Sequence, residues 1–244
     1  MKAETITPTV RRRLTLSSLL LAATLCVFPQ AALLAQSAEP GFVSMFNGKD
    51  LSGWDGEAGF WRVERGAIVG ETRVSNQHTT FLYWTGGEPA DFELHYRIRV
   101  IGKDANSGVQ IRSEKRPNWD ALGYQADFDG SGYLAGSLYR YQREPQATFA
   151  QRGDSVRIDS SGQRTVTTFA DAAMLLAAYR QGDWNDFRIL ATGQRVTVWL
   201  NGVMMCTVDD AQRQYTLSKG IIALQLHSGE PMRVEIKDLR IRVQ

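Results

Sequence analysis

The chain has 244 residues, of which 43% are hydrophobic and 22% are charged, close to the averages of soluble globular domains. This composition excludes disordered, collagen-like and coiled-coil proteins. The formal net charge is +2, and it includes four basic residues among the first 13. Ten Phe, eight Tyr, six Trp and 22 Gly residues favour strands and tight turns over a helical bundle.

Residues 1–38 predict a cleaved secretory signal peptide. Lys2 and the run from Arg11 to Arg13 precede an uncharged, apolar segment from Leu14 to Phe28, and small residues follow at Ala35 to Ala38. This segment is too short to span a membrane. We therefore expect a periplasmic or secreted protein that is not inserted in the membrane once the leader is removed.

Without this leader, the remaining chain carries 24 basic and 25 acidic side chains. A basic patch that would bind nucleic acid is therefore not expected. The single cysteine left, Cys206, stands in the apolar segment 203–208, which predicts a buried structural thiol.

Residues 39–244 contain no repeat and no linker, and we expect one domain. Alternating apolar residues predict strands at 91–100, 107–113, 124–128, 137–141, 185–191, 195–200, 203–208, 220–227 and 232–243. Asn201-Gly202 is a strong hairpin signal and makes the three segments from 185 to 208 a meander.

One short helix is expected near 171–180, where Met174, Leu175, Ala178 and Tyr179 form an apolar stripe that Gly182 ends. The polar stretch 143–164 predicts a long excursion that holds at most a short hairpin. Many short strands and one helix together predict an all-β, two-sheet antiparallel sandwich.

Three predicted strands carry unusual polar residues on the face opposite their large apolar residues. Alternation turns Val109, Ile111, Tyr124, Phe128, Leu224 and Leu226 inward. The other face then holds Gln110, Arg112, Gln125, Asp127, Gln225 and His227, with Tyr139 in the next strand. Planar amides, an Arg, an Asp, a His and aromatic rings suit sugar hydroxyls and ring faces better than the Lys, Glu and Thr of a solvated face. The alternative is an ordinary outer face whose polar groups bond one another.

Asp127 and Asp129 share one parity ahead of Gly130, so Asp127 is also a candidate ligand for a divalent cation. Alternatively, Asp127 to Gly130 simply end a strand and bind no cation. The sequence has no Cys/His cluster with zinc spacing, no phosphate-binding glycine loop and no Gly-x-Ser-x-Gly nucleophile motif.

Several segments resemble the 3-keto-disaccharide hydrolase family. The resemblance is carried by 42–54 (FVSMFNGKDLSGW), 61–70, 106–112 (NSGVQIR), 123–129 (GYQADFD), 150–153 (AQRG), 183–186, 201–202 and 223–227 (ALQLH). It extends over nearly the whole chain after the leader. The resemblance implies a concanavalin A-like lectin/glucanase jelly roll, and an exported bacterial enzyme acting on glycosides already oxidised to a ketone at carbon 3.

A ketone at carbon 3 acidifies the hydrogen on carbon 2, so a base can remove it and the glycosidic oxygen can leave from carbon 1. His227 and Asp127 are the candidates for the proton transfers, and either could be the base. Arg112, or a cation held by Asp127, is the candidate for stabilising the enolate oxygen. Gln110, Gln125, Gln225 and Tyr139 would position hydroxyl groups of an oligosaccharide or glycoside substrate.

Two rival functions use the same residues. A non-catalytic carbohydrate-binding module of this fold would bind the sugar without cleaving it. An interaction domain at the cell envelope would instead present a large exposed apolar patch.

Overall fold

The computed structural model describes residue 1 and residues 39–102, 104–141, 147–212 and 216–244. The predicted leader therefore falls outside the described residues except for Met1, and part of the polar stretch that begins at 143 does too. The chain from Ala38 to Gln244 forms one compact unit. Within the described ranges, no helix is long and apolar enough to cross a membrane.

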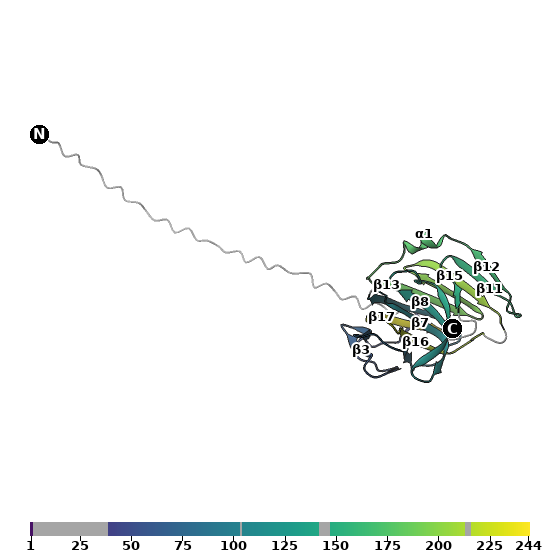
Figure 1. Ribbon diagram of the computed structural model, residues 1–244, viewed down its shortest axis with the longest axis horizontal. Coiled ribbons are helices and arrows are strands. Elements are labelled where there is room, and N and C mark those ends of the chain that lie inside the picture. Colours follow the sequence, from purple (N-terminus) through teal and green to yellow (C-terminus); the bar gives the residue numbers. More distant parts are fainter. Residues whose placement is uncertain (2–38, 103, 142–146, 213–215) are drawn as a thin grey trace. The chain divides into compact units, whose positions relative to one another are not determined.

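The described chain folds into two β-sheets (Figure 1). One sheet has ten strands, in the order β12 (Arg164–Thr168), β11 (Asp154–Ile158), β15 (Val203–Asp210), β14 (Arg195–Leu200), β13 (Asn185–Thr192), β6 (Phe92–Ile101), β17 (Met232–Val243), β4 (Ala67–Thr72) and β3 (Trp61–Glu64), with β1 (Val43–Ser44) also on β17. The other has seven strands, in the order β10 (Ala147–Ala150), β9 (Leu138–Tyr141), β8 (Asp120–Asp129), β7 (Asn106–Arg116), β16 (Ile221–Leu226), β5 (Thr80–Trp84) and β2 (Trp54–Gly56). This all-β architecture confirms the predicted two-sheet sandwich.

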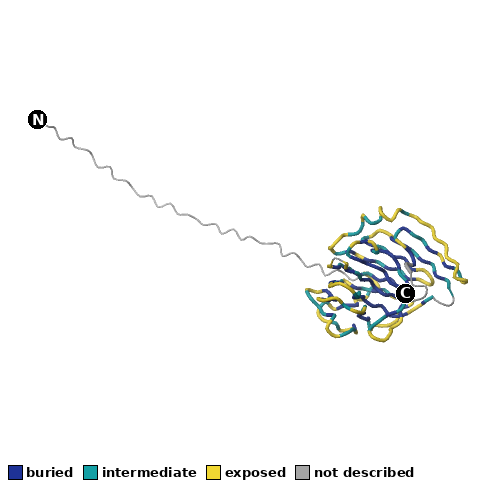
Figure 2. The backbone as a smooth tube through the Cα atoms, viewed as in Figure 1, coloured by how far each residue is buried: buried dark blue, intermediate teal, exposed yellow. Residues whose placement is uncertain are grey.

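The two sheets enclose one main hydrophobic core. Alternate residues of both sheets contribute to it, including Val109, Ile111 and Leu224 from one and Leu94 and Ile98 from the other, all essentially without solvent exposure. Figure 2 shows the buried positions running along the strands and the exposed ones gathered in turns and at sheet edges. Cys206 lies in this core, where burial raises the pKa of its thiol to about 12.

The predicted meander is present, since β13 pairs with β14 and β14 with β15, with Asn201-Gly202 in the second turn. One pairing departs from the antiparallel expectation, because β11 runs parallel to β15. The excursion before the helix forms the β11–β12 hairpin.

The helix α1 (Ala172–Leu176) is shorter than the predicted 171–180. The side chain of Asp171 accepts hydrogen bonds from the backbone N–H groups of Ala173 and Met174, which starts the helix. Leu175, Ala178 and Tyr179 pack against the main core as expected, but Met174 is exposed. One turn of helix cannot turn all four predicted positions toward the same surface.

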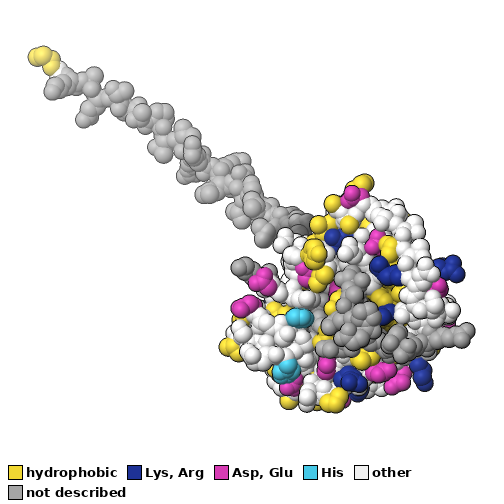
Figure 3. Space-filling model, turned by 45° about the vertical axis from the view of Figure 1, so that its right-hand side comes forward, with side chains coloured by type: hydrophobic (Ala, Val, Ile, Leu, Met, Phe, Trp, Pro, Cys, Tyr) yellow, Lys and Arg dark blue, Asp and Glu magenta, His cyan; other side chains and the backbone are white. Residues whose placement is uncertain are grey.

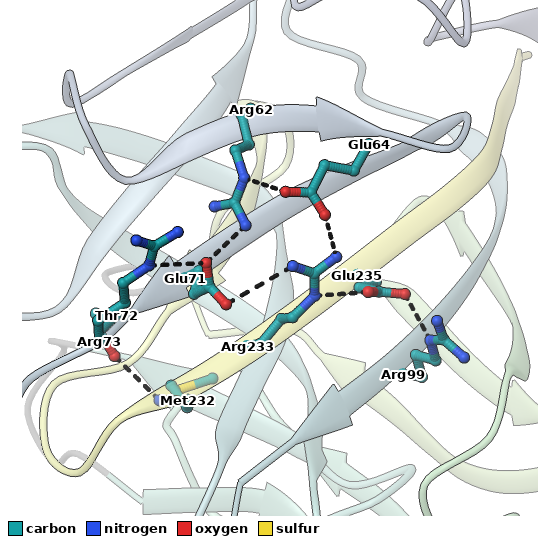
Figure 4. Close-up of polar contacts among 9 residues, drawn as sticks. All are labelled: Arg62, Glu64, Glu71, Thr72, Arg73, Arg99, Met232, Arg233 and Glu235. Carbon is teal, nitrogen blue, oxygen red and sulfur yellow. Dashed lines mark hydrogen bonds and ion pairs between the residues drawn. The ribbon is translucent and has the colours of Figure 1, made fainter.

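The outer face of the ten-stranded sheet carries a ladder of paired charges, which we call the ion-pair ladder. Figure 4 shows it crossing β3, β4, β17 and β6 through Arg62, Glu64, Glu71, Arg73, Arg233, Glu235 and Arg99. Hydrogen bonds from Arg233 and Arg62 hold the pKa of Glu64 at about 2. Charged side chains of both signs are scattered over the molecular face in Figure 3. The charged side chains of this sheet face thus pair with one another.

Candidate active site

The outer face of the seven-stranded sheet differs from the ion-pair ladder, because its centre holds amides instead of paired charges. Gln110 comes from β7, Gln125 and Asp127 from β8, and Gln225 from β16. We call these four residues the amide network. Their large apolar neighbours Val109, Ala126 and Leu224 point to the opposite side, into the main core. Strand alternation therefore selects this set, as the sequence predicts.

Gln125 is the centre of the amide network. Its Nε2 donates to Asp127 Oδ1 at 2.7 Å and to Gln225 Oε1 at 3.1 Å, and its Oε1 accepts from Gln110 Nε2 at 2.9 Å. Ser113 Oγ in turn donates to Gln110 Oε1 at 2.6 Å. All four network residues are buried. Their amide dipoles are therefore fixed in direction before any ligand arrives.

Asp127 carries the only carboxyl group of the amide network, and it is 3% exposed. Burial raises its pKa to about 7, the hydrogen bond from Gln125 acts in the opposite direction, and the nearby charge of Asp129 raises it further. Near neutral pH this carboxyl group is therefore present in both its protonated and its ionised form. That is the condition under which a general acid or base works best.

His227 follows β16 directly and keeps the parity of Gln225. Its ring is half-buried, and Nδ1 lies 2.5 Å from the backbone carbonyl of Ser228. A carbonyl oxygen only accepts hydrogen bonds, so Nδ1 carries the hydrogen. In the neutral ring Nε2 then keeps its lone pair, which can accept a proton. The structure shows no direct bond between His227 and Asp127.

Tyr139 lies beside the amide network, because it pairs with Gln125 where β9 adjoins β8. It is half-buried and packs against the apolar cluster of Phe81, Tyr83, Tyr141 and Ala223 on this outer face. The predicted position of Tyr139 next to the polar set is thus present.

Arg112 is not on this face, and the prediction that placed it there is wrong. Its guanidinium is 1% exposed and donates to the carbonyl of Ala90 at 2.7 Å, the carbonyl of Gly193 at 2.7 Å and Asp91 Oδ1 at 2.9 Å. Burial lowers its pKa while Asp91 opposes the change. Arg112 therefore ties the turn between β13 and β14 to the segment before β6, and it cannot stabilise an enolate beside Asp127.

A β-bulge causes this reversal. Ile111 pairs with Tyr124 and Glu114 pairs with Leu122, so Arg112 and Ser113 together face the single residue Gly123. Arg112 takes a positive φ of 46°, and the alternation shifts by one residue. Ser113 thereby takes the place that simple alternation gives to Arg112. Two glycines that face the bulge, Gly123 and Gly220, are the sequence signal for it. A Cβ on Gly123 would lie 2.8 Å from the Cα of Ser113, and a Cβ on Gly220 would lie 2.4 Å from the carbonyl oxygen of Ser113.

Asp129, the second carboxylate of the proposed cation site, serves the following loop. It accepts hydrogen bonds from the hydroxyl of Ser131 and from the backbone N–H of Leu134. The described residues contain no group of three or more His, Cys, Asp or Glu side chains that could hold a metal ion. Asp127 is therefore not part of such a cluster in the described part of the chain, and its role as a cation ligand stays a prediction.

Gly108 leaves the space that Gln125 occupies. A Cβ at position 108 would lie 2.8 Å from Gln125 Cγ, 2.9 Å from its Nε2 and 2.7 Å from the carbonyl oxygen of Ala126. Gly108→Ala should therefore push Gln125 away from Asp127 and cost about 1–3 kcal/mol of stability through overpacking. A urea unfolding curve measures the loss, and unchanged stability would contradict the close packing of Gln125 against position 108.

Several solved structures share this architecture. A Parabacteroides distasonis protein provisionally assigned as a glycosyl hydrolase aligns with a TM-score of 0.56 at 17% identity, covering 83% of this chain and 99% of that one. The carbohydrate-binding module CBM66 of Bacillus subtilis aligns with 0.50 at 14% identity, covering 77% and 94%. The β-glucanase of Bacillus licheniformis aligns with 0.50 at 10% identity, covering 83% and 97%. At these identities the likeness shows the jelly-roll fold alone.

No curated protein matches the chain in sequence. The model of one protein family does match, over residues 41–242, which is nearly all of the compact unit that holds the amide network. Because this match covers far more than half of the chain, the protein belongs to the family of the 3-keto-alpha-glucoside-1,2-lyase-like domain.

Proposed function

We propose that this protein cleaves the glycosidic bond of 3-keto-glucosides by elimination, with His227 as the base and Asp127 as the acid. The single observation that carries this proposal is the buried carboxyl of Asp127, whose pKa is about 7, inside a network of fixed amides. A structural network needs no ionisable group at this position, because Asn would accept the same hydrogen bond from Gln125. The family and the jelly-roll fold support a carbohydrate-related function in general.

The bond changes assign a separate task to each residue. His227 Nε2 takes the hydrogen from carbon 2 as a proton, and the electron pair of that C–H bond forms the enolate of the carbon-3 ketone. The enolate then restores the ketone, forms a double bond between carbons 1 and 2, and expels the glycosidic oxygen. Asp127 Oδ1 accepts from Gln125, so Oδ2 holds the proton that the leaving oxygen receives. Water can afterwards add across the double bond.

The enolate oxygen needs a donor, and Arg112 is not available for this task. Gln225 is the replacement that the structure offers, because its Oε1 accepts from Gln125 and its NH₂ group is therefore directed away from that bond. A neutral amide in a buried site stabilises a developing oxyanion without the cost of burying a permanent charge.

The decisive experiment compares a 3-keto-glucoside with the corresponding plain glucoside. The ketone form should be cleaved and the plain form should not, because without the carbonyl the hydrogen on carbon 2 is too weakly acidic for a side-chain base. In deuterated water the released sugar should carry deuterium at carbon 2, as mass spectrometry can show. Product without this deuterium would point to direct hydrolysis and overturn the elimination route.

The same experiment separates an enzyme from a carbohydrate-binding module. Binding of both forms with cleavage of neither would mean that the amide network holds a sugar only. In that case Asp127 and His227 would be ligand contacts and the proposal of catalysis would be wrong.

A further inference from the structure

The structure contains a hollow of about 820 Å³ that the proposed reaction does not use. Its described lining includes Ser228, the residue after His227, and Tyr141, which pairs with Gly123 two residues before Gln125. Its volume lies within the range of about 300–1000 Å³ that small-molecule sites occupy. The lining of the hollow thus includes a residue next to His227 in the chain and a residue of β9, the strand that pairs with Gln125.

One wall of the hollow is Trp119, at the tip of the long β7–β8 hairpin. Asn118 and Trp119 follow one another at positive φ, 61° and 59°. The Asn201-Gly202 turn also has two successive residues at positive φ, but there the second residue is glycine, which adopts this conformation without strain. A bulky aromatic residue in this conformation is a true outlier that costs about 1–2 kcal/mol. Strain of this kind is characteristic of functional sites, which makes the Trp119 ring a candidate ligand contact.

The Trp119 wall is held firmly in place. Its carbonyl accepts from the backbone N–H of Phe81 at 2.9 Å, and its ring stacks on Tyr83 with 5.8 Å between the ring centres. The hydroxyl of Tyr83 donates to the carbonyl of Asp120 at 2.7 Å. The hairpin tip is thus fastened to β5 of the same sheet.

The lining also includes an acid–imidazole pair, Glu57 and His78, whose Oε2 and Nε2 lie 2.9 Å apart. The segment of His78 is joined to the one after His227 by two backbone hydrogen bonds between Asn76 and Gly229, of 2.8 and 2.9 Å. The pair is therefore fixed relative to the base of the proposed reaction. His78 itself is exposed, and Glu57 lies 21 residues before it in the sequence.

The charge of the lining selects the ligand class. Glu57 and Asp120 are acidic, and the other described lining residues are aromatic, amide, hydroxyl, imidazole or proline side chains. Lys and Arg are absent among the described residues that line the hollow, so it does not attract phosphates or other anions. Carboxylates accept hydrogen bonds from hydroxyl groups, and aromatic faces pack against the C–H face of a sugar ring. A neutral, polyhydroxylated ring fits this chemistry.

We propose that the hollow between Trp119 and the Glu57–His78 pair is a second sugar subsite that binds a neutral sugar ring on the leaving-group side of the substrate. This inference rests on the proposed function. The leaving oxygen is attached to carbon 1, next to the carbon that His227 attacks. A leaving group that extends past His227 reaches Ser228 and enters the hollow.

Binding of unoxidised sugars tests the subsite without any cleavage. Calorimetry on residues 39–244 should show that at least one of trehalose, maltose and sucrose binds about tenfold more tightly than methyl α-glucoside. In Trp119→Gly and in Glu57→Gln this preference should disappear, so that the disaccharide and methyl α-glucoside bind with about equal affinity. Trp199→Ala is the matched control, because Trp199 lies in β14 and packs on Arg188 elsewhere on the molecule, and it should keep the full preference.

Trp119→Gly relieves the positive φ while it removes the stacked ring, and a thermal unfolding curve shows whether the variant is folded. Glu57→Gln changes no backbone, so it decides the matter if Trp119→Gly does not fold. A disaccharide preference that both variants retain, or that the wild type lacks for all three sugars, would overturn the subsite. Cleavage of 3-keto-glucosides without such a preference would leave the proposed function standing, whereas a Trp119-dependent preference without cleavage would leave the subsite standing and refute the function.

Discussion

Replacing Asp127 with Asn should abolish cleavage of a 3-keto-glucoside and, at pH 8, should make the fold more stable. Loss of a general acid typically reduces the rate by about 10²–10⁴-fold. The Asn side chain can still accept the hydrogen bond that Gln125 Nε2 donates to Asp127 Oδ1, so the amide network should persist. Activity assays and urea unfolding of the same two proteins measure both effects.

The stability gain follows from the raised pKa of Asp127. An Asp in the unfolded chain titrates near 4, whereas burial raises the folded pKa to about 7. Between these values the folded state binds more protons, so the stability of the wild type falls as pH rises from about 4 to about 7. The variant lacks this loss and should exceed the wild type by up to about 4 kcal/mol at pH 8, with little difference at pH 4.

The pH dependence of the wild-type rate has the corresponding sign. If protonated Asp127 is the acid, the cleavage rate should fall as pH rises above about 7. Asp209→Asn is a suitable control, because Asp209 lies in a surface ion pair with Arg195, and it should alter neither rate nor stability by much. Wild-type activity in Asp127→Asn, or a loss of its stability at pH 8, would refute the assigned role.

Replacing Arg112 with Ala should destabilise the fold by about 3–5 kcal/mol, the largest stability loss we expect. The guanidinium is buried, and its removal takes the side-chain donor away from the carbonyls of Ala90 and Gly193, while Asp91 keeps only the hydrogen bond from the backbone N–H of Gly193 among its bonds to these groups. Arg112→Lys should rescue little, because an ammonium group cannot match the planar geometry of three bonds in different directions. Urea unfolding measures the loss.

Activity per folded Arg112→Ala molecule should stay close to that of the wild type at low temperature. Arg195→Ala supplies the control for removing an arginine, because its side chain is 63% exposed and its loss should cost at most about 1 kcal/mol. If Arg112→Ala keeps the stability of the wild type but loses cleavage, Arg112 acts in the active site and the assignment of its side chain through the β-bulge is wrong.

The sequence alone predicted the sandwich, nine of its strands and the four members of the amide network, but not the strands from β1 to β5. Alternation of apolar residues is a local property that survives in the structure, so Gln110, Gln125, Asp127 and Gln225 could be assigned to one face before their partners were known. The same argument failed at Arg112, because one extra residue in β7 reverses every later side chain in the strand.

Only the tertiary structure decided what surrounds those residues. The pKa of Asp127 depends on burial, and burial is set by chain segments distant in sequence. The Glu57–His78 pair and the Trp119 wall meet because β5, β16 and the β7–β8 hairpin are neighbours in the sheet, which no local pattern records. Alternation thus fixes the direction of a side chain, while long-range pairing fixes its neighbours and with them its chemistry.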